Sequence, residues 1–167
     1  MKAVNKPRRW QSFGMVGISF AVMLAVGHPY LAISEDSEAF KPGLGEIMTL
    51  TQMRHEKLWF AGLNENWDLA RYELDELHEG FADALKFHPN HEKIGKPTAS
   101  VLPVFINAQL AELAKAVDAA DQNAFATAFD NLTAGCNGCH QATNHGFIVI
   151  RRPTASSYPN QDFTARK

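Results

Sequence analysis

The sequence predicts an all-α protein, an antiparallel four-helix bundle followed by an extended C-terminal tail. Two observations predict this fold class. Apolar residues recur three and four positions apart through four separate segments, which is the spacing of one buried helix face. No segment alternates apolar and polar residues as a half-buried strand does, and only the short apolar run FIVI at 147–150 has the character of a strand. The connections between the four segments are short, long and short, which suits an up-and-down bundle.

The first 34 residues form a separate unit. The opening MKAVNKPRRW carries four positive charges and no acid, and an uninterrupted apolar run of fifteen residues follows from Phe13 to Gly27. Ala32 and Ser34 then occupy small-residue positions of the kind that a signal peptidase requires. This order predicts a secretory signal peptide over residues 1–34 and export to the periplasm. A retained membrane anchor is the alternative, although a spanning helix needs about 20 apolar residues.

Cleavage of this segment would leave a mildly acidic chain. All 18 Asp and Glu follow residue 34, together with 12 of the 16 Lys and Arg, so the net charge of the remainder is about −6. Nucleic-acid binding depends on neutralising phosphates with Lys and Arg, so no nucleic-acid partner is expected. The remaining chain is long enough to bury one core. We expect one bundle domain over residues 35–145.

The first two helices have clear signals. Residues 44–62 are rich in helix-forming side chains and end in a glycine, so they predict the first helix. The second is expected from about 67 to 87. Its apolar stripe consists of Trp67, Ala70, Leu74, Leu77, Phe81 and Ala84. Prolines and glycine in residues 88–100 mark the one long connection.

The third and fourth helices are expected to begin at polar capping residues. Ser100 is the predicted cap of the third helix, with Pro103 tolerated in its first turn. Asp121 is the predicted start of the fourth helix. Residues 146–167 are polar after the FIVI run and contain two prolines, so they are expected to lie extended over the surface.

One motif carries chemistry, the stretch GCNGCH. It contains the only two cysteines of the chain, Cys136 and Cys139, followed directly by His140. Covalent attachment of haem needs two thiols on one helical turn for the two vinyl groups and an imidazole beside them for the iron. C-x-x-C-H is the recognised signature of such a site. Together with the predicted signal peptide, the motif predicts one covalently bound haem c.

Three other interpretations remain open for the motif. A zinc site needs four ligands, and Cys136, Cys139, His140 and His145 lie within ten residues, which leaves little chain to form a tetrahedron. A redox-active disulfide is expected at the start of a helix, where the helix dipole lowers the thiol pKa. A structural disulfide between cysteines three apart closes too short a loop to stabilise much. A haem-free zinc-bound or disulfide-stapled interaction module is therefore the alternative.

The position of the motif at the end of the last helix of a bundle resembles the class II c-type cytochromes, the family of cytochrome c-prime. The resemblance covers about residues 44–145. It implies that Cys136 and Cys139 form the thioethers and that His140 is the proximal iron ligand. The chain departs from the family pattern in its tail, which continues for 27 residues past His140.

In this family the first helix faces the distal side of the iron. A methionine there implies a six-coordinate, low-spin electron carrier, and an apolar residue implies an open iron that binds nitric oxide or carbon monoxide. The candidates are Met48, Met53, His55 and Leu58. Met48 and His55 lie seven residues apart, so they share a helix face nearer to the apolar centre than Met53. His55 is expected closer to an iron held at mid-bundle, because Met48 lies near the helix start. Arg54 and Leu58 have the spacing of the family's open sites, and Arg54 is also a candidate partner of a haem propionate.

The expected function is that of a periplasmic monohaem c-type cytochrome that transfers single electrons between partner proteins. Met48 or His55 is the candidate distal ligand, and gas binding at a five-coordinate iron is the alternative. No enzyme activity is expected, because no catalytic triad, carboxylate pair or phosphate loop can be recognised. Membrane contact is expected only if the N-terminal segment is retained, and a homodimer is expected by analogy alone.

Overall fold

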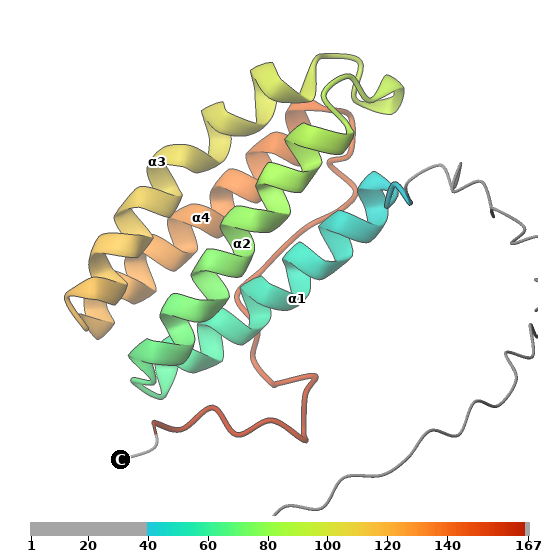
Figure 1. The fold of residues 1–167 in the computed structure, drawn as a ribbon. Coiled ribbons are helices and arrows are strands. Elements are labelled where there is room, and N and C mark those ends of the chain that lie inside the picture. Colours follow the sequence, from blue (N-terminus) through green and yellow to red (C-terminus); the bar gives the residue numbers. More distant parts are fainter. Residues whose placement is uncertain (1–39, 166–167) are drawn as a thin grey trace, which may run out of the picture. The chain divides into compact units, whose positions relative to one another are not determined.

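The computed structural model describes residues 40–165, and the predicted signal peptide lies outside these described residues. Four α-helices and one 3₁₀ turn make up the regular structure: α1 (Leu44–Leu63), α2 (Trp67–Phe87), η1 (Glu92–Ile94), α3 (Thr98–Asp118) and α4 (Gln122–Ala142). Residues 40–165 contain no strand. The prediction of an all-α four-helix bundle with an extended tail is confirmed (Figure 1).

Consecutive helices pack side by side, and α4 returns to contact α1. The pairs α1–α2 and α3–α4 pack most extensively, whereas α1 and α4 touch least among adjacent helices (Figure 1). Because neighbouring helices alternate in direction, the start of α1 lies at the same end of the bundle as the end of α4. This arrangement decides which residues can meet the cysteine motif.

The apolar stripes predicted from the sequence meet in a single core. In α4, Phe125, Phe129 and Leu132 are almost completely buried. The ring of Trp59 from α1 lies 6.1 Å from that of Phe125 and 5.0 Å from that of Phe129. Burial of each such side chain contributes about 1.5–3 kcal/mol relative to exposure. Gly62 lies against Phe125, and a methyl group in its place would overlap the Phe125 ring.

The predicted start of α4 is confirmed. Asp121 is the N-cap, and its carboxylate accepts hydrogen bonds from the backbone N–H groups of Asn123 and Ala124, both at 3.0 Å. These bonds satisfy two of the donors that a helix leaves free at its first turn. The last helix, which carries the cysteine motif, therefore begins where its sequence indicates.

The predicted cap of α3 is wrong. The helix begins at Thr98, because the Thr98 N–H donates to the carbonyl of Pro89 at 2.8 Å and closes the connection before it. Pro97 occupies the N-cap position, and Ser100 lies inside the first turn, where its hydroxyl donates to the Pro97 carbonyl at 2.8 Å. Pro103 consequently lies in the second turn instead of the first.

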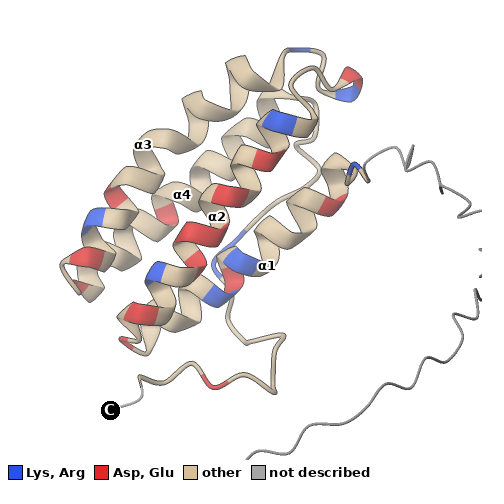
Figure 2. Ribbon diagram, in the orientation of Figure 1, with Lys and Arg blue, Asp and Glu red and all other residues tan. Residues whose placement is uncertain are grey.

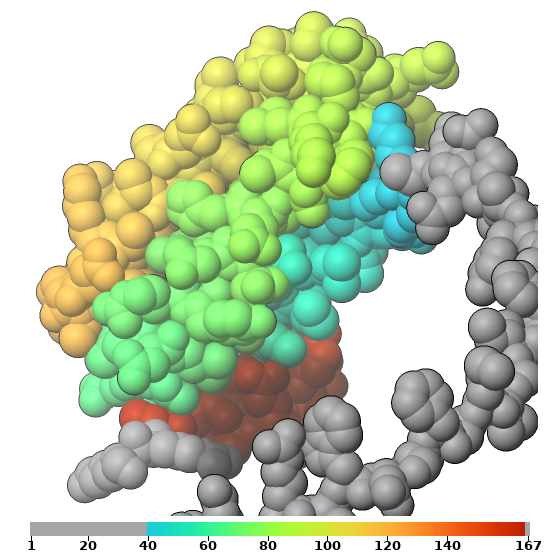
Figure 3. Space-filling model, in the orientation of Figure 1, coloured from blue at the N-terminus to red at the C-terminus, as the bar shows by residue number. Residues whose placement is uncertain are grey.

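The tail after α4 contacts both α1 and α4, the two adjacent helices that touch least. Arg152 donates to the Asp130 carboxylate of α4 at 2.9 Å, and its guanidinium lies 4.3 Å from the Trp59 ring centre on α1. Further along, Phe163 packs on Phe60, with 5.6 Å between ring centres. The tail covers the surface beside α1 and the start of α2 (Figure 3).

Charged side chains are unevenly distributed over the bundle. Six acidic residues recur along α2, whereas the α2–α3 connection carries Lys93 and Lys96 (Figure 2). Among the described helices, α3 alone is apolar and long enough to cross a membrane, a test of length and composition that core helices of water-soluble proteins also pass. Ile106, Leu110 and Leu113 of α3 are buried in the bundle core.

Candidate cofactor site

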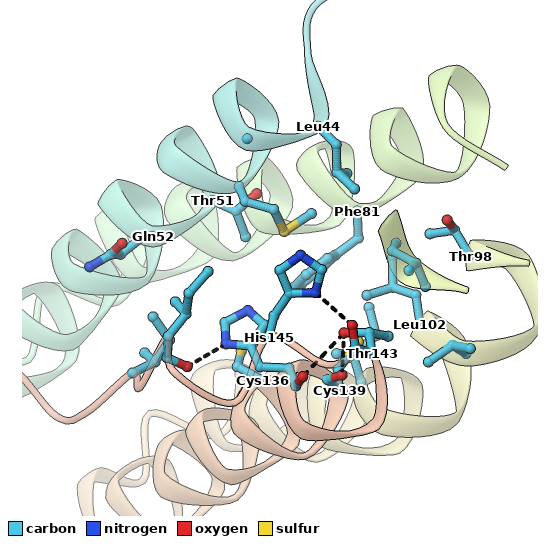
Figure 4. A pocket seen from close by; sticks show the side chains of 18 of the residues that line it. Leu44, Thr51, Gln52, Phe81, Thr98, Leu102, Cys136, Cys139, Thr143 and His145 are labelled. Carbon is cyan, nitrogen blue, oxygen red and sulfur yellow. Dashed lines mark hydrogen bonds between the residues drawn. The ribbon is translucent and has the colours of Figure 1, made fainter. Parts of the chain in front are cut away.

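A cavity of about 420 Å³ lies at the end of the bundle where α1 begins and α4 ends. All four helices, the α2–α3 connection and the tail contribute to its walls (Figure 4). The walls are mostly apolar, with Leu44, Phe81, Leu102 and Ile106 among the lining residues. The volume lies within the ~300–1,000 Å³ range of small-molecule and cofactor sites.

The last two turns of α4 bring the motif to this cavity. Cys136, Cys139 and His140 all line it, because residues three and four apart share one helix face. The glycines of the motif lie on the other side. A Cβ at Gly135 would come within 2.3 Å of the Phe105 carbonyl oxygen of α3. The absence of a side chain there lets α4 lie close against α3 while the cysteines face the cavity (Figure 4).

The tail sets the orientation of His140. Its Nδ1 lies 2.8 Å from the carbonyl oxygen of Ile148. A carbonyl can only accept, so Nδ1 carries the proton and Nε2 keeps its lone pair. Metal-binding histidines show this arrangement, in which a partner on one nitrogen fixes the tautomer that leaves the other free. His140 thus has a ligating nitrogen available.

The tail is in turn held by the motif. The side-chain amide of Asn137 donates to the carbonyl of Ile150 at 2.8 Å, and the N–H of Ile150 donates to Asn137 Oδ1 at 2.8 Å. We call this pair of bonds the Asn137–Ile150 clamp. It holds the chain two residues from Ile148, the partner of His140. The two residues between the cysteines are therefore part of the site, since one packs on α3 and the other binds the tail.

Both thiols are free, and burial makes them poor nucleophiles. Burial, with a smaller contribution from neighbouring Cys139, raises the pKa of Cys136 to about 11. Burial also raises the pKa of Cys139. Redox-active cysteines need the opposite, a thiol pKa lowered by positive surroundings. The environment does not suit a redox-active disulfide.

Only two of the four candidate distal residues line the cavity. Met48 and His55 do, whereas Met53 and Leu58 do not. Leu58 is completely buried in the bundle core. The pair of Arg54 and Leu58, which had the spacing of an open gas-binding site, therefore has no member in the cavity wall.

His55 is a neutral histidine held by hydrogen bonding and stacking. Its Nε2 lies 2.8 Å from the Thr133 hydroxyl, which itself donates to the Phe129 carbonyl at 2.9 Å, so Nε2 is the donor to Thr133. The His55 ring stacks on Phe129 with 4.3 Å between ring centres. Burial lowers the pKa of His55 to about 4.

The hydrogen bond between His55 and Thr133 shows how far α1 and α4 are shifted along each other, because it places these two residues at the same level. Met48 precedes His55 by seven residues, and His140 follows Thr133 by seven residues on the antiparallel helix. At 1.5 Å per residue, both lie about 10.5 Å farther toward the same end of the bundle. Met48 and His140 therefore lie at one level on facing walls. The cavity extends along α1 from the start of the helix, since both Met48 and His55 line it.

Arg54 lies elsewhere. Its guanidinium binds Glu76 of α2 twice, through the carboxylate at 2.8 Å and the backbone carbonyl at 2.9 Å. It packs close to Gly80 at the α1–α2 contact and is not among the residues that line the cavity. The structure does not bring Arg54 together with the cysteine motif.

Three cavity residues on the α2–α3 connection and at the first position of α3 escaped the sequence analysis. They are His91, Lys93 and Thr98. The Thr98 hydroxyl and His91 Nδ1 are buried and have no hydrogen-bond partner. A histidine and lysines within a loop give no sign of a site by themselves, so only the folded chain reveals them. His145 also lines the cavity, and its Nδ1 donates to the Thr143 carbonyl at 2.7 Å.

Within residues 40–165, no three His, Cys, Asp or Glu side chains are gathered closely enough to hold a metal ion. Comparisons with protein-family models, with curated proteins and with solved structures find no match.

Proposed function

We propose that this protein is an exported monohaem c-type cytochrome that passes single electrons between partner proteins. One observation carries the proposal. Cys136, Cys139 and His140 line the same cavity as Met48, and Met48 lies level with His140 across it. The two thiols would add to the haem vinyl groups to form thioethers, and His140 Nε2 and the Met48 sulfur would bind the iron.

The chemistry of the cavity walls fits a haem. A porphyrin is flat and apolar with two carboxylates, and the walls are mostly apolar with some polar side chains, among them those of His91, Lys93 and Thr98. The Thr98 hydroxyl and His91 Nδ1 are buried polar atoms without a partner, and each is able to donate a hydrogen bond to a bound carboxylate. The donor set and the apolar lining both support this cofactor.

When bound, the haem would supply a one-electron redox couple, and the chain would tune it. The hydrogen bond from His140 to Ile148 would hold the imidazole in the tautomer and orientation that ligation needs. Ligation by the Met48 thioether would favour the reduced iron and raise the potential. The apolar walls would limit contact between water and a bound haem, which has the same effect.

Met48 is the better candidate for the sixth position. His55 Nε2 is engaged by Thr133, and the ring is stacked on Phe129, so ligation by that nitrogen would break both contacts. Met48 has no hydrogen bond to lose, and its thioether side chain is long and flexible. We therefore assign the sixth position to Met48.

The alternatives have less support. A zinc site needs four ligands around one point, and the described residues gather no group of three. A redox disulfide needs thiols of lowered pKa, and the pKa of each thiol is raised. The proposal of export depends on the sequence of residues 1–34 alone, which the structure does not describe.

The first test is whether haem stays attached after denaturation. The full chain is produced in an exporting host that matures c-type cytochromes, denatured, and assayed by its pyridine haemochrome spectrum. Haem that remains on the chain, and is lost from a Cys136→Ala, Cys139→Ala double variant, supports the proposal. Denatured protein without haem overturns it and returns the zinc module to first place.

The second test identifies the sixth ligand. Electron paramagnetic resonance of the ferric protein should give a low-spin signal. Met48→Leu should convert it to high spin, whereas Met53→Leu, the matched methionine outside the cavity, should leave it low-spin. A high-spin unmodified protein that binds carbon monoxide on reduction would replace electron transfer with gas binding. Loss of the low-spin signal only in His55→Leu would name His55 instead.

A further inference from the structure

We propose that Thr98, His91 and Lys93 form the site that holds the haem carboxylates. This site lies on the α2–α3 connection and the first residue of α3. The inference rests on the proposed function and extends it, since the sequence pointed to Arg54 for this role. Arg54 is instead engaged by Glu76 outside the cavity.

Thr98 is the first observation. Its side chain lies in the cavity wall and is 4% exposed, yet its hydroxyl has no hydrogen-bond partner (Figure 4). Two other buried threonines of the wall are satisfied within their helices, as Thr51 donates to the Ile47 carbonyl and Thr143 to that of Cys139, both at 2.8 Å. Thr98 is the first residue of α3, so it has no helical carbonyl four residues earlier.

An unsatisfied buried hydroxyl is unfavourable. It costs about 1–3 kcal/mol, and most buried side-chain polar atoms in folded proteins have a partner. An acceptor delivered by a ligand would remove this cost. The cavity next to Thr98 is where such a ligand would lie.

His91 and Lys93 add a second, independent observation. His91 Nδ1 is buried without a partner. The His91 ring packs edge-on against His88, with 5.5 Å between centres, and His88 Nε2 donates to the Pro42 carbonyl at 2.7 Å. Lys93 follows two residues later, lines the same cavity, and forms no ion pair with any described residue.

The charge of the cavity wall selects an anion. No Asp or Glu is among the lining residues that the structure describes. Besides the motif, the titratable side chains of the wall are His55, His91, Lys93 and His145. The N-terminus of α3 also lies at this wall, and the positive end of its dipole favours negative charge. The basic residues of the connection are visible in Figure 2.

The chemistry of haem matches this arrangement. The two propionates lie on the edge of the porphyrin opposite the two vinyl groups. A ring attached to α4 through Cys136 and Cys139 therefore presents its carboxylates to walls that α4 does not form. The connection and the first residue of α3 form such a wall, and they offer one hydroxyl, one imidazole and one ammonium group.

The experiment measures the pKa of the propionates in the haem-loaded full chain. The variants are Lys93→Gln and Thr98→Val. The control for Lys93→Gln is Lys96→Gln, because Lys96 is an exposed lysine of the same connection outside the cavity wall. The control for Thr98→Val is Thr51→Val, because Thr51 lies in the cavity wall and its hydroxyl already donates to the Ile47 carbonyl. The propionate methylene resonances, which the ferric iron shifts away from other protein signals, are followed by NMR from pH 4 to pH 8.

Removal of a cation or a donor from an ionised carboxylate raises its pKa. Lys93→Gln and Thr98→Val should each raise a propionate pKa by about one unit, a tenfold change in proton affinity. Both controls should titrate like the unmodified protein. Because Lys93 is exposed, Lys93→Gln should fold, and its propionate pKa tests the carboxylate site even where Thr98→Val fails to fold.

Two negative results have different meanings. If haem remains on the denatured chain but both variants titrate like their controls, the carboxylate site is refuted and the proposed function stands. If the denatured chain carries no haem, the proposed function is refuted and the carboxylate site with it.

Discussion

The Asn137–Ile150 clamp leads to a prediction about the tail. Asn137→Ala removes both hydrogen bonds, each 2.8 Å long, between the motif and the tail. A hydrogen bond of this kind contributes about 1 kcal/mol net, so the change should weaken tail docking by about 2 kcal/mol. At 1.4 kcal/mol per factor of ten, the fraction of molecules with a released tail should rise about 30-fold.

Limited proteolysis measures this fraction. Trypsin cleaves after Arg151, which lies next to the clamped segment, and cleavage requires the segment to leave the bundle. When opening and closing are fast relative to cleavage, the rate follows the population of the open form. The cleavage rate at Arg151 should therefore rise about 30-fold in the variant.

Asn131→Ala is the matched control. Asn131 is an exposed asparagine on the same helix, and the described structure records no hydrogen bond from its side chain. Its variant should be cleaved at the rate of the unmodified protein. A rate for Asn137→Ala that equals this control would refute the clamp. It would also remove the support that the tail gives His140, because Ile148 is positioned next to the clamp.

Two further predictions concern stability. The folded pKa of His55, about 4, lies below its unfolded value of 6.5, so the unfolded state takes up a proton first as the pH falls. Stability should therefore be fully present above pH 6.5 and fall by about 3 kcal/mol toward pH 4. Urea unfolding at pH 7 and at pH 4 measures this loss of stability. The loss should be smaller in His55→Leu, whereas the control His78→Leu, at an exposed histidine, should lose as much as the unmodified protein. An equal loss of stability in His55→Leu and in the unmodified protein would contradict the prediction. Gly135→Ala would place a methyl 2.3 Å from the Phe105 carbonyl oxygen and should destabilise the fold by about 1–3 kcal/mol or more. Gly45→Ala is the control and should not destabilise the fold, because no atom lies within 4 Å of the added carbon. Thermal melting measures both variants. Equal melting midpoints for the two would show that α3 and α4 are not in close contact at Gly135.

The sequence by itself determined the helices and the place of the Cys-x-x-Cys-His motif on the last of them. Spacings of three and four identified the buried faces, and Asp121 marked the start of α4. Such signals are local, since a helix face and a cap depend on residues within one or two turns. For the same reason, the spacing of Cys136, Cys139 and His140 was enough to predict that they share one helix face.

One local signal failed because a distant residue outweighed it. Ser100 had the right chemistry for a cap, but the hydrogen bond from Thr98 to Pro89 starts α3 two residues earlier. The choice between the two starts depends on the path of the whole connection. The short run FIVI likewise forms no strand, because Ile148 and Ile150 pair with α4 side chains and not with another strand.

Only the tertiary structure decided which residues surround the motif. Periodicity describes rotation about the axis of one helix and carries no information on how far one helix is shifted along its neighbour. That shift, set by contacts such as His55 with Thr133, brings Met48 level with His140. It also places the cavity beside Thr98, a residue that no sequence pattern distinguishes from the other threonines.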